Sequence, residues 1–314
     1  MSVLALDLGG TKLAVALFSS QGEILSGDSI QLNNRKGRQV GELIATEVKK
    51  FAAKEGDALK AIGVSVPGIS RQKTGSVWAP NIPGWEDYPL VSEIREAAVR
   101  ASVHMDSDRA CSILGEQWQG NAKGCKDAIF MAVGTGIGAG ILIDGNILRG
   151  ADDIAGAVGW LALKTPFENK YIPCGCYEYY ASGDGMARYA NELMASDSGY
   201  YGLLKLFRAE ALTAQHVFDA REQNDPIAAK VFNEAIQLWG MAVANFISIF
   251  NPEKIIFGGG VFGPAVKFIP HIQAEARKWA QPISFTKVSF ERSALEGNAA
   301  IYGAGFLALK NSNS

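Results

Sequence analysis

Two stretches of the chain share one pattern, in which an apolar run enters a glycine turn and a second apolar run leaves it. In the first, residues 4–8 and 13–17 flank a Gly-Gly pair, a pattern that predicts a β-hairpin. In the second, residues 127–133 run into a glycine-rich stretch at 134–140, and a further strand is predicted at 141–143. The recurrence predicts two domains built on the same plan.

Apolar residues at helical spacing separate further short apolar runs. Positions 40, 43, 44, 48 and 51 predict an amphipathic helix over 38–54. Residues 226–250 are apolar nearly all round, which predicts a buried helix that begins after Asp225-Pro226. Strands are predicted at 23–29, 60–66, 102–105 and 254–257, and a last helix at 297–309. Alternating strands and helices predict an α/β fold.

Composition narrows the class of protein. The chain has 314 residues, enough for two domains, and its 48% apolar and 20% charged residues suit a globular enzyme. A net charge of -2 gives no basic surface for nucleic acid or membrane, and no apolar run is long enough to span a bilayer. Four cysteines and no signal-like start predict a cytoplasmic protein without a disulfide framework.

The first glycine turn carries groups that suit a phosphate. Gly9 and Gly10 allow backbone N–H groups to approach phosphate oxygens, and Thr11 and Lys12 extend the same turn. Asp7 is placed to hold a metal ion or a metal-bound water. Taken alone, the turn is equally compatible with an ordinary polar hairpin.

A second candidate lies where the strand at 102–105 leads into Asp106-Ser107-Asp108. A helix is predicted directly afterwards, so Asp108 lies near a helix N-terminus. Polar residues at that position often cap the helix.

The motifs, taken in order, resemble the ROK family (repressors, open reading frames and kinases) of bacterial sugar kinases, within the hexokinase/actin-like ATPase superfamily. Each motif is weak alone because glycine turns are common, but seven in the family's order and spacing are specific. They lie at residues 7–12, 66–68, 79–85, 107–116, 134–140, 175–178 and 257–260. The resemblance implies two RNase H-like α/β domains flanking a cleft, a smaller one at 1–118 plus 297–314 and a larger one at 119–296.

The resemblance also implies ATP-dependent phosphorylation of a hexose or modified hexose, with ATP and Mg²⁺ as cofactors. A small-molecule sugar is then the substrate, and a homodimer is the expected assembly. The magnesium would be held through ATP at Asp7. The residues implied for the nucleotide are Asp7, Gly9, Gly10, Thr11, Lys12, Gly134, Thr135, Gly136, Gly138, Gly258, Gly259 and Gly260.

On the sugar side, the resemblance makes Asp108 the general base, with Ser107 where the family usually has Asn. A hydroxyl still donates to a sugar oxygen but lacks the second group of an amide. The residues implied for the sugar are Gly68, Asn81, Ser107, Asp108 and Glu178. Gly68 is equally typical of a plain turn, whereas for Asn81 and Glu178 a sugar contact is favoured over a turn residue and an exposed loop acid, respectively.

The chain departs from the family at residues 156–160, where the family usually has Glu-x-Gly-His. Ala157 has no acceptor for a sugar hydroxyl, and Trp160 cannot bind zinc. Only Cys174 and Cys176 remain where the family has three cysteines, whereas a structural zinc needs about four ligands. We therefore expect no structural zinc.

Without a metal, the loop at 164–176 needs another support. The apolar side chains available to it are Trp160, Phe167, Tyr171 and Ile172, so we expect these four to cluster. We also expect Trp160 to lie near the sugar pocket.

Two functions other than a kinase are compatible with the family resemblance. A ROK transcriptional regulator would carry a helix-turn-helix before the first hairpin, and a hairpin starting at Leu4 leaves no room for one. A sugar-binding or regulatory protein that has lost catalysis is suggested by Ala157 and Trp160. Asp7, Asp108 and both glycine turns favour the kinase. The sugar itself, whether glucose, fructose, mannose, allose, an N-acetylated hexosamine or an amino sugar, is not indicated.

Overall fold

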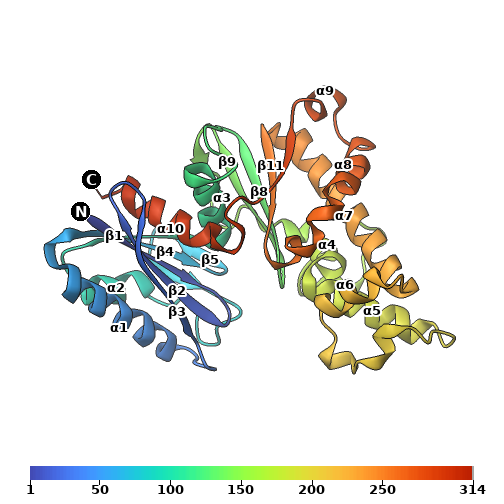
Figure 1. Ribbon diagram of the computed structural model, residues 1–314, viewed down its shortest axis with the longest axis horizontal. Coiled ribbons are helices and arrows are strands. Elements are labelled where there is room, and N and C mark those ends of the chain that lie inside the picture. Colours follow the sequence, from blue (N-terminus) through green and yellow to red (C-terminus); the bar gives the residue numbers. More distant parts are fainter. Residues whose placement is uncertain (313–314) are drawn as a thin grey trace. The chain divides into compact units, whose positions relative to one another are not determined.

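The computed structural model describes residues 1–312, which form two compact units (Figure 1). Unit 1 consists of Met1–Gly124, Ile147–Ala155 and the segment from Gly297 onward, and unit 2 of Cys125–Asn146 and Gly156–Glu296. Residues 119–124 and 147–155 thus pack with unit 1, although the sequence placed them in the larger domain. Residues 313 and 314 of the predicted smaller domain lie outside the described part.

Unit 1 is built on a five-stranded sheet in the order β3-β2-β1-β4-β7. The predicted first hairpin pairs β1 with β2 antiparallel, while β4 and β7 continue the sheet in parallel. The strands are β1 Ser2–Leu8, β2 Lys12–Ser19, β3 Ile24–Gln31, β4 Leu59–Val66 and β7 Ser102–Ser107. A separate small hairpin joins β5 Ile69–Arg71 to β6 Ser76–Trp78.

The alternation of side chains along β1 divides the core of unit 1 between two faces. Leu4, Leu6 and Leu8 pack in the cluster that contains α1 (Arg38–Glu55) and α2 (Leu90–Ala97). Val3 and Ala5 pack in the cluster of α3 (Asp108–Gln119) and α10 (Ala299–Lys310). The strand period of two explains this division.

Glycine residues allow α10 to pack closely against both α3 and β4. A Cβ at Gly303 would lie 1.7 Å from the carbonyl oxygen of Cys111, and one at Gly63 would lie 1.8 Å from that of Ala304. Neither overlap can be relieved by a side-chain rotation, because the neighbouring atoms are backbone. The last helix therefore fixes α3, whose first residue is Asp108.

Unit 2 repeats the plan with a sheet in the order β10-β9-β8-β11-β12, in which β8 and β9 pair antiparallel and β11 and β12 continue the sheet in parallel. Its strands are β8 Ala128–Val133, β9 Ile137–Ile143, β10 Asn146–Ile147, β11 Lys254–Gly258 and β12 Ser289–Arg292. The predicted start of the second strand at 141 was wrong. Gly138 and Gly140 pair with Ala132 and Phe130 in the ladder, so only residues 134–136 form the turn.

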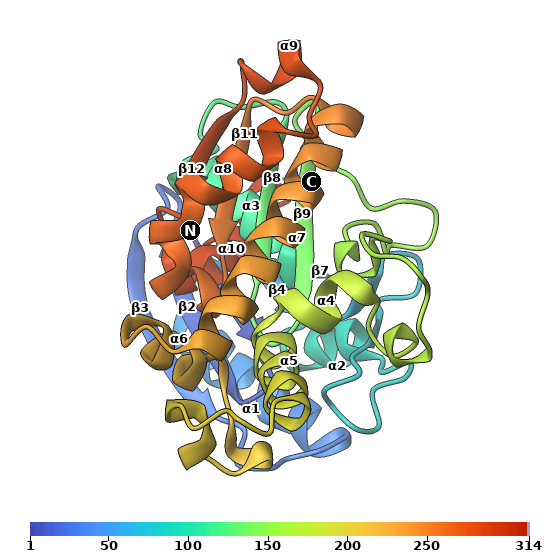
Figure 2. The same cartoon turned by 90° about the vertical axis from the view of Figure 1, so that its right-hand side faces the viewer.

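The long helix α7 (Pro226–Phe250) is the central helix of unit 2 (Figure 2). Asp225 caps it as predicted, since its Oδ1 accepts from the N–H groups of Ile227 and Ala228. The helix is not buried all round, because Lys230, Asn233 and Gln237 form an exposed stripe at helical spacing. Its other helices are α4 Cys176–Ala181, α5 Gly183–Ser196, α6 Ala214–Glu222, α8 Ile269–Arg277 and α9 Pro282–Phe285.

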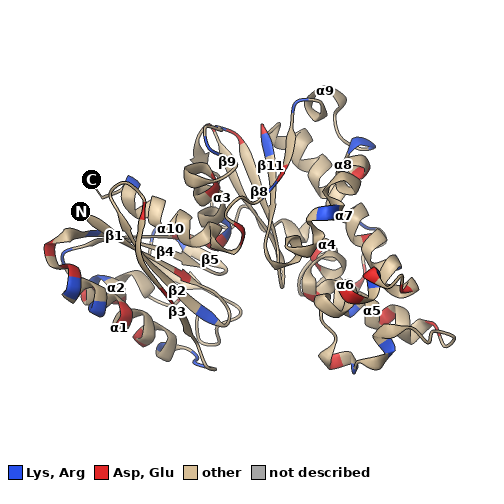
Figure 3. Cartoon of the chain, viewed as in Figure 1, with Lys and Arg blue, Asp and Glu red and all other residues tan. Residues whose placement is uncertain are grey.

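Short 3₁₀ turns complete the chain at 56–58, 158–160, 169–171, 203–206, 209–211, 260–262, 264–268 and 296–298. Positive and negative side chains are interspersed over both units (Figure 3). Within residues 1–312, no helix combines the length and the apolar character that crossing a membrane requires.

Candidate functional site

The first glycine turn presents its polar groups to solvent. Asp7 lies near the end of β1, and the turn closes with a hydrogen bond from the Gly9 N–H to the Lys12 carbonyl at 2.9 Å. The side chains of Thr11 and Lys12 are exposed, as is Gly10. The hairpin therefore leaves these groups accessible to a ligand.

Asp7 is held from the neighbouring strand. The Ser65 hydroxyl on β4 donates to Asp7 Oδ1 at 2.6 Å. Burial raises the pKa of Asp7 to about 6, and the negative charge of Asp108 adds to this. Ser65 and Lys12 oppose the rise in this pKa. Two mutually repelling carboxylates favour a bound cation, so oxygen donors of this kind fit a magnesium ion.

Asp108 is the first residue of α3 and not its N-cap. Ser107 is the N-cap of α3, because its Oγ accepts from the Ala110 N–H at 3.4 Å. Asp108 Oδ1 accepts from the Arg109 N–H at 2.8 Å, and the side chain is exposed. Desolvation raises the pKa of Asp108 and Arg109 opposes this.

Arg109 was not identified from the sequence, although it holds the loops beside Asp108. Its Nη1 donates to the Gly68 carbonyl at 3.0 Å, and its Nε donates to the Ala155 carbonyl at 3.1 Å. Gly68 has a φ of +81°, and a Cβ there would lie 2.1 Å from the Trp78 carbonyl oxygen. The backbone thus requires glycine at 68 whether or not a ligand binds.

Asn81 belongs to the loop that faces the first glycine turn. Its side chain is exposed, and its Nδ2 lies 3.2 Å from the position of a Cβ at Gly10. Trp85, four residues later, is buried and stacks on Tyr88 with ring centroids 4.4 Å apart. Asn81 is therefore accessible to a sugar, whereas Trp85 is committed to packing.

In unit 2, Glu178 contacts the second glycine turn, a contact that sequence reasoning missed. Glu178 lies in the first turn of α4, and its Oε2 accepts from the Ile137 N–H at 2.6 Å. A Cβ at Gly136 would lie 2.7 Å from this oxygen, and one at Gly159 would lie 2.8 Å from it. Desolvation raises the pKa of Glu178, which the Ile137 N–H and Arg188 oppose. Neither Gly136 nor Gly159 has a positive φ, so the close approach of Glu178, rather than backbone conformation, accounts for glycine at both positions.

We expect Gly136→Ala to displace Glu178, because the added methyl group would lie 2.7 Å from its Oε2, closer than the two atoms can approach. The loss of a partly buried, charge-assisted hydrogen bond predicts a fall of about 1–3 kcal/mol in the free energy of unfolding. Urea denaturation measures this. Gly134→Ala is the matched control, since nothing lies within 4 Å of a Cβ there. Equal losses in both variants would contradict the assigned contact.

The glycines at 258–260 differ in what they face. A Cβ at Gly258 would lie 2.2 Å from the Phe130 ring. Gly259 has a φ of +86°, and its Cβ would lie 2.4 Å from the Val133 carbonyl oxygen. Only Gly260 faces open space within 4 Å. Packing explains the first two glycines, and Gly260 alone offers an unobstructed approach. In the second turn, Thr135 is exposed and Gly138 is part of β9.

The expected apolar cluster in the loop at 164–176 was wrong. Trp160, Phe167 and Ile172 are 57%, 71% and 61% exposed, and Tyr171 alone is buried. The loop is held by polar contacts: the Tyr171 hydroxyl donates to Glu168 at 2.7 Å and lies 3.2 Å from the Tyr180 hydroxyl.

Lys170 and Cys176 add further contacts to this loop. Lys170 Nζ lies 5.7, 5.4 and 5.4 Å from the ring centroids of Tyr171, Tyr179 and Tyr180. Cys176 Sγ lies 3.1 Å from the Leu161 carbonyl oxygen. Cation–π contacts of this kind need no metal.

We expect the purified protein to contain no stoichiometric zinc, because Trp160 stands where the resembling family has a zinc-binding His. Within residues 1–312, no three His, Cys, Asp or Glu side chains are grouped as metal ligands. The melting temperature in the absence of ATP should stay within about 1 °C when a chelator is added. Elemental analysis that finds one zinc per chain would contradict this prediction.

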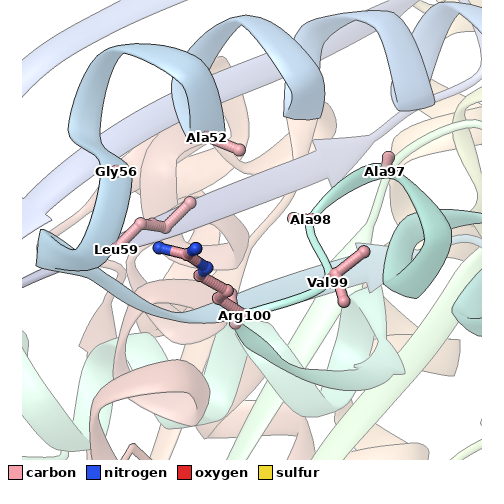
Figure 4. A pocket seen from close by; sticks show the side chains of 8 residues that line it. Ala52, Gly56, Leu59, Ala97, Ala98, Val99 and Arg100 are labelled. Carbon is pink, nitrogen blue, oxygen red and sulfur yellow. The ribbon is translucent and has the colours of Figure 1, made fainter.

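A small cavity of about 270 Å³ in unit 1 offers little chemistry (Figure 4). It lies beside the C-terminal end of α1, and alanines, Leu59 and Val99 line most of it. Arg100 at its edge pairs with Asp57. A cavity with this lining has no group for acid–base work.

Comparison with known proteins shows to which family and structures the chain is similar. A family model described as "ROK family" matches residues 3–311. A glucokinase of Halalkalibacterium halodurans is 32% identical over 324 residues, covering 99% of this chain and 96% of the relative. A xylose repressor of Caldicellulosiruptor bescii is 26% identical, covering 96% and 76%. The structure of a ROK family glucokinase from Streptomyces griseus in complex with glucose and AMPPNP is 27% identical, with a TM-score of 0.79 and coverage of 99% and 100%.

The protein is thus a two-unit α/β protein of the actin-like ATPase fold, with a glycine-turn hairpin in each unit. The chain belongs to the ROK family. The resemblance stated from the sequence motifs is thereby confirmed.

Proposed function

We propose that this protein is an ATP-dependent sugar kinase that phosphorylates a hexose or modified hexose. The observation that carries the proposal is the placement of Asp108. Its carboxylate is exposed, Ser107 rather than Asp108 caps the helix, and the charge of Asp108 raises the pKa of Asp7 at the end of β1. A glucokinase relative that covers nearly the whole chain supports the assignment.

In this proposal Asp108 accepts the proton of the reacting sugar hydroxyl and orients its oxygen toward the γ-phosphate. The exposed side chain of Asn81 donates to another sugar hydroxyl, and Ser107 and Gly68 border the same pocket. Glu178 is retained as a sugar contact through Oε1, since Oε2 is engaged by Ile137.

The nucleotide is assigned to the glycine turns. The backbone of Gly9, Gly10 and Thr11, with Lys12, holds phosphate oxygens in unit 1, and Gly134, Thr135 and Gly136 do so in unit 2, where Gly138 follows in β9. Gly260 borders the adenosine, because Gly258 and Gly259 face packed neighbours. Asp7 would bind the Mg²⁺ ion that accompanies ATP, and this ion would neutralise negative charge on the phosphates.

The test is a coupled assay for ADP release with purified protein, ATP, Mg²⁺ and a panel of neutral, N-acetylated and amino hexoses. We expect at least one sugar to raise the rate of ADP release at least about 10³-fold over the rate without sugar. No sugar-dependent ADP release, with normal folding, would refute the proposal.

The second candidate is a sugar-binding regulator without catalysis. It is favoured by Ala157 and Trp160, which replace two sugar-contacting side chains of the resembling family, and by the likeness to a repressor. Saturable sugar binding in calorimetry without ADP release would support this candidate. ADP release that follows sugar binding would exclude it.

A further inference from the structure

A second cavity, of about 690 Å³, lies wholly within unit 1. It is bordered by the turn between β5 and β6, by α2, by β7, by residues 149–153 and by the end of α10. The residues assigned above to ATP and sugar do not line it. Its size falls in the range of about 300–1,000 Å³ that is typical of small-molecule sites.

The lining of this cavity is rich in positive charge. Its charged and titratable side chains are Arg71, Lys73, Arg95, His104, Arg149 and Asp153. Four permanent cations thus face a single carboxylate. Such an imbalance in a concave surface concentrates positive potential and attracts anions.

Two of the cations are already neutralised in part. Arg149 donates through Nε and Nη2 to Asp106 Oδ2, at 3.0 and 2.6 Å. Arg71 Nε lies 3.5 Å from Asp87 Oδ1 but is buried and makes no hydrogen bond. A buried donor without an acceptor is unfavourable, and an anion in the cavity would supply one.

The other two cations carry the excess charge. Within residues 1–312, neither Lys73 nor Arg95 forms an ion pair, and both side chains are exposed. Burial, together with the charge of Arg95, lowers the pKa of His104 in the cavity wall. The positive field of Arg95 therefore reaches into the cavity.

We propose that this cavity is a binding site for a small metabolite that carries phosphoryl groups, separate from the proposed nucleotide site. Guanidinium groups match the geometry of phosphate oxygens through paired N–H donors, and a lysine adds a mobile charge. The cavity exceeds the volume of a lone phosphate, so a bisphosphate or a sugar phosphate fits it better.

Isothermal titration with inorganic pyrophosphate and with a hexose bisphosphate tests the proposal, at constant ionic strength and without ATP. We expect saturable binding that weakens at least about tenfold in Lys73→Ala/Arg95→Ala. Arg38→Ala/Lys49→Ala, which removes the same charge from the exposed face of α1, should bind like the wild type. Lys12→Ala should also retain this binding, because Lys12 belongs to the first glycine turn.

Three results would overturn the proposal. They are the absence of saturable binding, equal weakening in the cavity variant and the α1 variant, and loss of binding in Lys12→Ala with none in the cavity variant. Citrate, a polycarboxylate probe, should bind more weakly than both phosphate compounds, and tighter binding of citrate would contradict the assigned chemistry. Failure to phosphorylate any sugar would refute the proposed function and leave the cavity proposal standing.

Discussion

Asp108→Asn should lower the turnover number by about 10²–10⁴-fold, which is the usual cost of losing a general base. An amide cannot accept the proton of the sugar hydroxyl at neutral pH. The fold should change little, because the hydrogen bond that Asp108 Oδ1 accepts from Arg109 can be accepted equally by the amide oxygen. Steady-state kinetics and urea denaturation measure the two effects.

Ser107→Ala is the matched control for this variant. It removes the cap hydrogen bond to Ala110 and should lower the free energy of unfolding by about 1 kcal/mol. Its effect on turnover should be much smaller than that of Asp108→Asn. If Asp108→Asn keeps near-wild-type turnover and loses stability instead, Asp108 is a structural residue.

The pattern of apolar residues and glycine turns predicted most strands of unit 1, but in unit 2 it predicted only β8, β9, β11 and α7. Two apolar runs on either side of a Gly-Gly pair predicted the first hairpin, and an apolar helical stretch with an Asp-Pro start predicted α7. The error at β9 has a simple cause: the run of glycines at 134–140 is typical of a turn, yet Gly138 and Gly140 pair in the ladder. Hydrogen bonding between strands does not require side chains, so composition alone gave no sign of it.

The site was predictable where a residue type carries the chemistry, and not where the contact is made in three dimensions. Asp7 and Asp108 were identified as acids in turn positions. Their electrostatic coupling, the Ser65 hydrogen bond and the Glu178 contact with the second glycine turn each join segments that are distant in sequence. Residue type and local spacing do not determine such pairings. The loop at 164–176 shows the same limit, since its aromatic residues predicted an apolar cluster and the structure supports it through Lys170 and tyrosine hydroxyls.

Asp7→Asn should stabilise the protein while it inactivates it. Burial raises the pKa of Asp7 from 3.8 to about 6, so the folded state holds this proton more tightly than the unfolded chain does. The free energy of unfolding contributed by Asp7 is therefore highest below the unfolded pKa, falls as the pH rises from 3.8 to about 6, and stays low above that. A neutral amide removes this loss.

At pH 8 we expect the free energy of unfolding of Asp7→Asn to exceed that of the wild type by about 2 kcal/mol, and at pH 4 by much less. Turnover should fall at least about 10²-fold, because the proposed ligand of the magnesium–ATP complex is lost. Urea denaturation at both pH values, without nucleotide or added metal, measures the first effect. Asp28→Asn, on the exposed strand β3, should change neither quantity. A variant that is destabilised equally at both pH values would show that the Asp7 carboxylate stabilises the fold rather than costing it stability, and would remove the electrostatic reason for placing a cation beside it.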